Sequence, residues 1–241
     1  MKLVISQPMY FPWVGMFEQI NLSDVFVYYD DVQFSKGSFT NRVQVKNNSI
    51  EGFKWLTVPL KGHKLGANIN EIEIDNSKSW KEQHLALLHG CYGNSEYYDE
   101  MMDIVHGVFQ KYHTGISDLA KCSMDAVIQY FDFSTDREFR LSSELDIPGN
   151  SSERVYKIAK FLNADLYITG HGAKNYLDHQ LFDTNGIGVE YMTYERRPYP
   201  QLFGTFNPHV SILDLIANMG KEGKKSIISK TKNWKEFINE S

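Results

Sequence analysis

Residues 7–18 read QPMYFPWVGMFE and follow the short apolar run Leu3-Val4-Ile5. The apolar run predicts a first strand. Pro8 and Pro12 then rule out a regular helix, because proline lacks a backbone donor and favours extended conformations in the residue before it. Gly15 permits a turn into a following helix. A strand that ends in such a loop before a helix is where α/β proteins build ligand crevices; the alternative is a proline-rich turn packed on the core.

Further strands are predicted downstream of this loop. The aromatic and β-branched run 24–29 predicts a buried strand. Residues 43–45 and 53–58 are separated by Asn, Ser and Gly and predict a hairpin. Residues 69–74 alternate in hydrophobicity, as an edge strand does.

The hydrophobic period becomes helical from Ser79 to about Tyr130 and predicts helices that begin near residues 79, 98 and 116. The polar segment 132–150 is expected to be a connection. The last third returns to alternating elements, with helices predicted at 151–162 and 211–219 and strands at 164–169 and 188–192. We expect the basic tail, residues 221–235, to be a solvated surface.

These patterns predict a single α/β domain over residues 1–241, with a mixed sheet and flanking helices. Its core is expected to come from residues 1–78 and 146–241. The helical middle, about 79–145, is expected to be an insertion.

Composition narrows the class of protein. The net charge is −5, and no Lys- or Arg-rich run precedes the tail, so a broad nucleic-acid surface is not expected. Two cysteines without CxxC spacing, and histidines without HxH or HExxH, give no reason to expect a metal site. The start is too polar for a signal peptide and no window suits membrane insertion, so we expect a cytoplasmic protein with reduced thiols.

Two places offer candidate catalytic groups, each after a predicted strand, where open α/β sheets hold ligands. Asp30 and Asp31 end the run 24–29, and either carboxylate could deprotonate an amine, orient an ammonium or hold Mg²⁺. His171 lies between Gly170 and Gly172 and could act as a general base. The alternatives are a loop acid satisfied by backbone amides and a structural histidine.

Other side chains are candidates for substrate binding. Arg42 and Arg154 carry planar forks that match phosphate oxygens, and Arg154 also opens a predicted helix whose free amides would attract an anion. Together they could hold the pyrophosphate of a nucleotide-linked sugar; surface salt bridges are the alternative. The remaining candidates carry a polar handle on a large or amide side chain: Gln7, Tyr10, Trp13, Asn41, Tyr199, Gln201 and Asn207.

The segment QPMYFPWVGMFEQI followed by DDVQFSKGSFTNR resembles the opening of the WbqC-like family, bacterial proteins associated with O-antigen and related polysaccharide loci. The likeness runs over almost the whole chain. One position departs from it: the family often has His before the Gln-Pro pair, where this chain has Ser6. Further matching segments are Trp55–Pro59, Ser152–Val155, Tyr167–Gly170, Phe206–Pro208 and Ser211–Asp214.

The resemblance implies transfer of glycine or a similar aminoacyl group to a nucleotide-linked amino sugar. Asp30, Asp31 or His171 would be the base, and Gln7 or Asn41 would donate to the oxyanion. The donor would be a charged carrier protein, a charged tRNA or an acyl-adenylate, so use of ATP and Mg²⁺ stays open. Two rivals remain: a nucleotidylyltransferase and a non-enzymatic scaffold of polysaccharide assembly.

Overall fold

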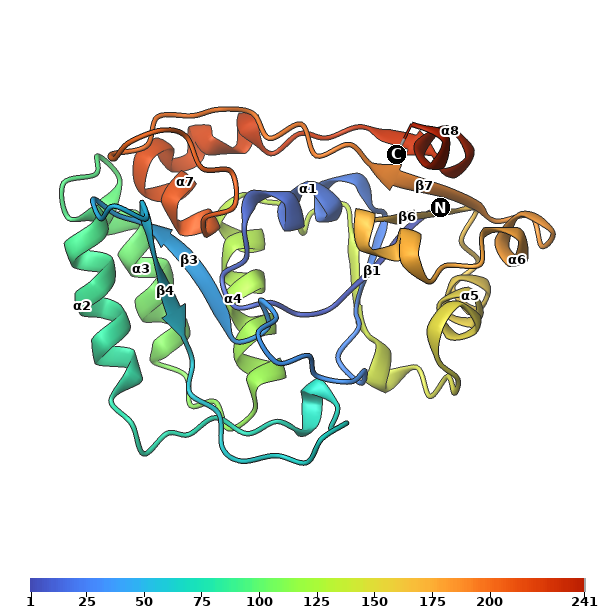
Figure 1. The fold of residues 1–241 in the computed structure, drawn as a ribbon, viewed down its shortest axis with the longest axis horizontal. Helices are drawn as coiled ribbons and strands as arrows, with labels where there is room; N and C mark the ends of the chain where they lie inside the picture. Colours follow the sequence, from blue (N-terminus) through green and yellow to red (C-terminus); the bar gives the residue numbers. More distant parts are fainter. Residues whose placement is uncertain (241) are drawn as a thin grey trace.

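The computed structural model describes residues 1–240, and its central element is a six-stranded sheet of order β5-β2-β1-β6-β7-β8 (Figure 1). Neighbouring strands from β5 to β7 are parallel, and β8 runs antiparallel to β7. The predicted α/β class with a mixed sheet is therefore confirmed. The strands are β1 (Lys2–Ser6), β2 (Val25–Tyr28), β5 (Glu138–Leu141), β6 (Leu166–Thr169), β7 (Gly188–Met192) and β8 (Thr231–Asn233).

Both faces of the sheet are buried, as expected for parallel strands. Leu3 and Ile5 of β1 face one apolar core, and Val4 between them faces the other. The first core is covered by α5 (Ser151–Phe161), α6 (His179–Asp183) and α8 (Trp234–Asn239). The second is covered by α1 (Val14–Leu22), α4 (Ile116–Tyr130) and α7 (Ile212–Met219). Figure 1 shows these two groups of helices on opposite sides of the sheet.

The second core also takes in the hairpin and the remaining long helices. The hairpin strands β3 (Arg42–Lys46) and β4 (Phe53–Thr57) pair antiparallel, as predicted. They pack with α2 (Trp80–Tyr92) and α3 (Tyr98–Phe109), which lie where the helical period placed them. Tyr28 of β2 donates a hydrogen bond to Asp125 of α4 at 2.6 Å, so the helical middle is fastened directly to the sheet.

Three local predictions are wrong. Residues 69–74 contain the 3₁₀ helix Ile69–Glu71, because Glu71 accepts a hydrogen bond from the Asn68 amide in a capping box. The apolar spacing there reflects isoleucines that turn inward from an irregular segment. The segment 132–150 holds β5, and the basic tail holds β8, so neither is merely a connection or a solvated surface. Both strands are short and polar and form by pairing with a distant strand.

The order of the strands reverses beside β1. The chain moves outward from β1 to β2 and β5, then returns to the other side of β1 to form β6 and β7. Loops after β1 and β6 therefore diverge at the carboxyl edge of the sheet, which is where open α/β folds leave a ligand crevice. None of the helices within residues 1–240 has the length and apolarity needed to cross a membrane.

Candidate functional site

A pocket of about 780 Å³ opens where the strand order reverses. It is lined by Ser6 at the end of β1 and Gln7 after it, by Tyr29 and Asp31 after β2, and by the segment 169–173 at the end of β6 and just beyond it. Its volume suits a small organic ligand. The loops predicted from residues 7–18, 30–31 and 170–172 therefore meet around one cavity.

His171 lies at the start of the 3₁₀ helix His171–Asn175 and lines the pocket. Its Nε2 donates to the carbonyl oxygen of Met192 at 2.7 Å. Because a neutral imidazole has one protonated nitrogen, this bond leaves Nδ1 as the proton acceptor. The ring packs against Tyr194 and Phe237, with centroids 5.0 and 4.8 Å away, which fixes its orientation. His171 can therefore accept a proton from a bound group.

Asp31 forms an ion pair with Arg154, the fourth residue of α5. Ser142 Oγ also donates to Asp31 at 2.5 Å. Burial by itself would raise the pKa of Asp31, but the hydrogen bonds from Arg154 and Ser142 and the Arg154 charge outweigh it and lower that pKa. Asp31 is therefore an anion and a weak base, better suited to orienting an ammonium group than to removing its proton.

Asp30 lies outside the pocket lining and is 4% exposed. Its carboxylate accepts hydrogen bonds from Ser142 Oγ at 3.1 Å, from the Ser143 amide at 3.1 Å and from Ser143 Oγ at 2.8 Å. These bonds tie the end of β2 to the turn after β5. Asp30 therefore matches the alternative given for it, a loop acid whose oxygens are hydrogen-bonded within the protein. Its role differs from that of Asp31, which lines the pocket.

The start of α5 borders the pocket through Ser151, the first residue of the helix, and through Gly149 and the N-cap residue Asn150 just before it. Gly149 has a φ of 126°, a conformation that favours glycine, and Ser151 has a φ of 46°. Within residues 1–240 the Asn150 side chain at the N-cap position makes no capping bond, so the amides of the first turn stay available. Such a helix start attracts phosphate.

Aromatic and amide side chains complete the walls. Tyr29, Tyr176 and Tyr194 line the pocket, and Gln19 of α1 donates to the Tyr194 hydroxyl at 2.7 Å. Tyr194 has a φ of 49°, so its backbone is held in a sparsely populated region. Sequence reasoning missed these four residues, although Gln19 and Tyr29 stand within or directly after the segments that it singled out.

Three of the predicted binding residues near the amino terminus lie away from the pocket. Tyr10 is fully buried, and its hydroxyl bonds His84 Nδ1 at 3.0 Å. Asn41 is buried and donates to the Val58 carbonyl oxygen at 3.0 Å. Trp13 lies behind Tyr194, one of the residues that line the pocket.

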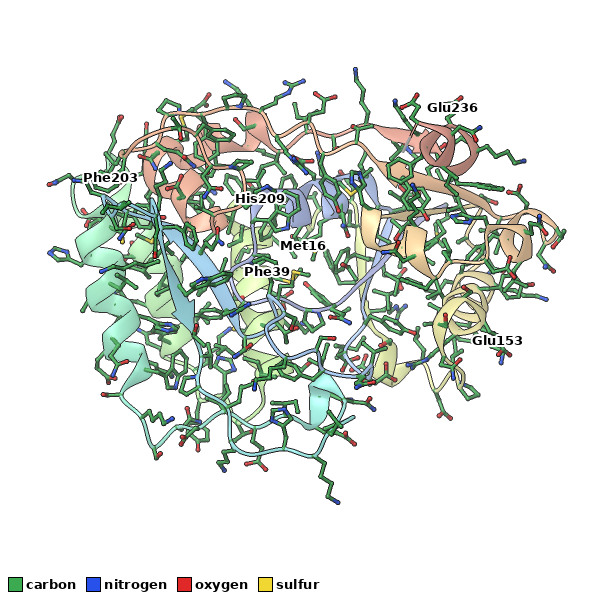
Figure 2. The ribbon with its side chains drawn as sticks, in the orientation of Figure 1. Met16, Phe39, Glu153, Phe203, His209 and Glu236 are labelled. Carbon is green, nitrogen blue, oxygen red and sulfur yellow. The ribbon has the colours of Figure 1, made fainter. Side chains whose placement is uncertain are left out.

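The Trp13 ring packs on Tyr194, with centroids 5.0 Å apart, and on His209, which lies beside α1 in Figure 2. Trp13 thus supports a pocket residue without lining the pocket itself.

The two predicted phosphate-binding arginines are not brought together. Arg42 on β3 donates to the Gly37 carbonyl oxygen at 3.1 and 2.7 Å and stacks over Trp55 at 4.3 Å. Arg154 lines the pocket, but its Nε donates to the Ile147 carbonyl oxygen at 2.9 Å and its terminal nitrogens face Asp31. The Arg154 guanidinium is therefore bonded within the protein and fixes the start of α5, and it is not free to bind a phosphate in the way predicted.

Tyr199, Gln201 and Asn207 lie together before α7 and are not among the residues that line the pocket. Gln201 donates to the Tyr199 hydroxyl at 3.2 Å and to the Asn207 carbonyl oxygen at 3.1 Å, and accepts from the Asn207 amide at 2.9 Å. These bonds hold the segment in a loop, and they give its polar side chains a structural role.

The fold and the pocket define an α/β protein that presents a polar, aromatic-walled cavity at the strand-order reversal of a mainly parallel sheet. The chain belongs to the WbqC-like protein family, whose model matches residues 7–226. It is also similar to the uncharacterized protein Rv1507c of Mycobacterium tuberculosis (strain ATCC 25618 / H37Rv), with 34% identity over 227 residues, 92% of this chain and 95% of that protein. No solved structure matches the chain significantly.

Proposed function

We propose that the protein is an enzyme that transfers an aminoacyl group, glycyl in the simplest case, to the amino group of a nucleotide-linked amino sugar. The observation that carries the proposal is that His171, Asp31 and the start of α5 border one pocket. A base, an anion that can orient an ammonium and a phosphate-attracting helix start are the groups that such a substrate requires. The link to surface polysaccharide biosynthesis follows from the family resemblance.

In this reaction the sugar amine attacks the carbonyl carbon of the donor, and the amine proton passes to His171 Nδ1. The bond from that carbon to the donor then breaks, and the carrier thiol, the tRNA hydroxyl or AMP leaves, with the proton returned from His171 where the leaving group needs one. Asp31 orients the amine through its negative charge, since its pairing with Arg154 makes it a poor proton acceptor. Gln7 lines the pocket and supplies amide hydrogens towards the oxyanion. Asn41, the other residue expected in that role, is committed to the Val58 carbonyl oxygen.

The nucleotide part of the substrate is expected at the start of α5, with its pyrophosphate against the amides of residues 151–153. Tyr29, Tyr176 and Tyr194 offer ring faces to the sugar or the base. The charged or titratable groups among the described lining residues, apart from tyrosines, are Asp31, Arg154 and His171, and the first two neutralise each other. A pyrophosphate-linked sugar therefore suits the pocket better than a nucleoside triphosphate, which carries more negative charge.

ATP and Mg²⁺ enter the proposal only as components of the donor. Residues 1–240 contain no group of three or more His, Cys, Asp or Glu side chains that could hold a metal ion. Mg²⁺ would thus be bound chiefly by the phosphates that accompany it, with Asp31 as the nearby carboxylate.

Incubation with a nucleotide-linked amino sugar, a carrier thioester or charged tRNA bearing glycine, and ATP with Mg²⁺ tests the proposal by mass spectrometry. A glycyl mass on the sugar is expected, and an N-acetylated sugar should give no product because its amine is blocked. Omitting each component in turn identifies the donor.

Nucleotidylyl transfer is the second candidate, because the pocket directly follows β1 and its proline-containing loop. Release of pyrophosphate from a nucleoside triphosphate and a sugar phosphate, with no acylation, would establish it. Binding of the nucleotide sugar without any turnover of the donors would instead support a scaffold in polysaccharide assembly.

A further inference from the structure

Tyr194 lines the pocket at the strand-order reversal together with His171. The two rings stand edge to face, with centroids 5.0 Å apart and planes at 70° to each other. Tyr194 belongs to the segment after β7, whereas His171 belongs to the segment after β6. A proton acceptor and a phenolic hydroxyl group from two different segments therefore lie side by side on one wall of the pocket.

The Tyr194 hydroxyl acts as a hydrogen-bond acceptor within the protein. Gln19 Nε2 donates to its oxygen at 2.7 Å, and an amide NH₂ group can donate a hydrogen bond but cannot accept one. Among residues 1–240, the hydrogen of the Tyr194 hydroxyl itself has no hydrogen-bond acceptor. Because Gln19 and Tyr194 both line the pocket, that hydrogen is available to a bound ligand.

Tyr194 is held in place from several sides. Its backbone has a φ of 49°, and its amide donates to Ser229 Oγ at 3.1 Å. The Trp13 ring packs on the Tyr194 ring, with centroids 5.0 Å apart. A Cβ at Gly170 would lie 2.5 Å from the hydroxyl oxygen, so only glycine permits this approach. A backbone in such a sparsely populated region persists where its surroundings hold it, and such positions cluster at functional sites.

The Tyr194 phenol stays protonated at neutral pH. Burial raises the pKa of Tyr194 to about 12, and the charge of Glu18 adds to the increase. The hydrogen bond from Gln19 and the charge of Arg196 lower this pKa but do not outweigh the burial. Tyr194 can therefore donate a hydrogen bond without losing its proton.

We propose that Tyr194 is a further catalytic residue, whose hydroxyl donates a hydrogen bond to the oxyanion of the tetrahedral intermediate in aminoacyl transfer. This inference rests on the proposed function. In the intermediate the amine nitrogen and the oxyanion are attached to the same carbon. The acceptor of the amine proton and the donor to the oxyanion must therefore be neighbours, as His171 and Tyr194 are.

Tyr194 keeps its hydrogen throughout the reaction. Its hydrogen bond to the oxyanion strengthens as negative charge develops and weakens when the carbonyl group forms again and the leaving group departs. Gln7 remains the other donor to the oxyanion. Gln19 is a positioning residue, because it fixes the direction in which the Tyr194 hydroxyl donates.

Tyr194→Phe removes the hydroxyl group and keeps the ring, so it tests the role directly. The full-length protein is assayed with a nucleotide-linked amino sugar and the glycyl donor that the wild-type protein uses, and calorimetry measures the affinity for the sugar nucleotide. We expect kcat to fall about 10²–10³-fold, the loss that follows removal of one oxyanion donor. The affinity and KM should not change, since the oxyanion forms only after binding. The fall should be the same from about pH 6 to pH 9, because Tyr194 does not ionise in that range.

Gln19→Glu provides a second test. A carboxylate accepts hydrogen bonds, so it would bind the Tyr194 hydroxyl hydrogen and withdraw it from the pocket. We expect kcat to fall in this variant at unchanged KM. In the Tyr194→Phe background the same substitution should have little further effect, because the two residues act through one hydrogen bond. An equal fall in both backgrounds would contradict the positioning role of Gln19.

Tyr92→Phe is the matched control. The Tyr92 hydroxyl is also buried and accepts a hydrogen bond, from the Lys46 amide at 3.0 Å, but Tyr92 is not among the residues that line the pocket. This variant should keep the wild-type kcat. Circular dichroism checks folding, and should Tyr194→Phe not fold, the kcat of Gln19→Glu decides the outcome.

The outcomes separate this inference from the proposed function. A wild-type kcat in Tyr194→Phe, or a raised KM at unchanged kcat, would overturn the role of Tyr194 and leave the aminoacyl transfer intact. A wild-type protein that transfers no aminoacyl group from a carrier thioester, a charged tRNA or an acyl-adenylate would overturn both.

Discussion

Arg154 and Asp31 are 123 residues apart in sequence, yet their side chains pair in the lining of the pocket and join the first turn of α5 to the loop after β2. The Arg154 side chain is 8% exposed and that of Asp31 is 21% exposed. The Arg154 guanidinium also lies over the Tyr29 ring, 5.2 Å from its centroid. One arginine therefore fixes the positions of a carboxylate, an aromatic wall and a helix start.

Replacing Arg154 should destabilise the protein and weaken nucleotide-sugar binding. We expect Arg154→Met to cost about 1–3 kcal/mol, below the range for fully buried pairs because water reaches part of Asp31. Arg154→Lys should keep the fold but lose the fork that holds Asp31. Urea unfolding and calorimetric binding measure the two effects.

The pair Glu153–Lys157 supplies the control on the same helix. Its two side chains are exposed at 2.6 Å separation, and Glu153 lies on the outer side of α5 (Figure 2). Lys157→Met should change stability by less than about 0.5 kcal/mol. Equal losses in Arg154→Met and Lys157→Met would contradict the role given to the Arg154–Asp31 pair.

His171→Ala should lower the rate of the chemical step by about 10²–10⁴-fold, because a general base contributes that much. The melting temperature should hardly change, since His171 is exposed and makes a hydrogen bond to a single carbonyl group. Single-turnover kinetics with the nucleotide-linked amino sugar measure the rate. His106→Ala, an exposed histidine on α3, is the control, and an active His171→Ala would remove the proposed base.

Gly15→Ala should disturb the pocket from behind. A Cβ at Gly15 would lie 2.3 Å from the Trp13 ring, which must then leave its place against Tyr194. We expect a loss of about 1–3 kcal/mol in unfolding free energy and weaker ligand binding. Gly90→Ala in α2 meets open space and should be neutral or stabilising, so similar losses in both variants would contradict this account.

Two buried carboxylates should make the protein less stable as pH rises from acid towards neutral. Burial raises the pKa of Glu18 to about 7 and that of Asp214 to about 6. Contacts with Ser229 at Glu18, and with Tyr199, Gln201 and Tyr92 at Asp214, act to lower these pKa values but do not outweigh the burial. Between the ordinary pKa of each acid and its raised value the folded state binds a proton that the unfolded state has lost, so stability falls as pH rises through that window.

Glu18→Gln and Asp214→Asn should each flatten this decline, and the double variant should flatten it further. Urea unfolding between about pH 4 and pH 8 measures the slope. The Asp31 ion pair has the opposite effect on the pH dependence of stability. Because the pKa of Asp31 is lowered in the folded state, the pair stabilises the fold above the ordinary pKa of an aspartate, and this stabilisation is lost as pH falls through the lowered pKa. An unchanged slope in the double variant would show that neither acid is protonated in the native state near pH 5.

The sequence predicted the elements whose periodicity is strong. The apolar run of β1, the aromatic run of β2 and the helical hydrophobic period of α3 and α4 are all clear in the sequence. β5 and β8 were not predicted, because they contain polar residues such as Glu138, Arg140 and Lys232 and show no apolar pattern. The strand conformation of β5 and β8 depends on pairing with β2 and β7.

The candidate site was predictable only in part, for a similar reason. Asp31, His171, Gln7 and Arg154 follow strands or open a helix, so their meeting at one sheet edge follows from topology. Tyr10 and Asn41 carry the same kinds of polar group, but whether such a side chain faces a cavity or the core depends on packing. Asp30 and Asp31 are adjacent, but their roles differ because Ser143 bonds Asp30 whereas Arg154 pairs with Asp31. These partners are more than 100 residues away in sequence, so no local pattern predicts the difference.

β8 has a consequence for how the chain folds during synthesis. After β7 the chain leaves the sheet for α7 and returns only at Thr231, where β8 pairs with β7. Until residues 231–233 leave the ribosome, the edge of β7 that β8 will cover is unpaired and open to other chains or to a chaperone. Nascent chains that stop before residue 231 should therefore be the species most prone to aggregate.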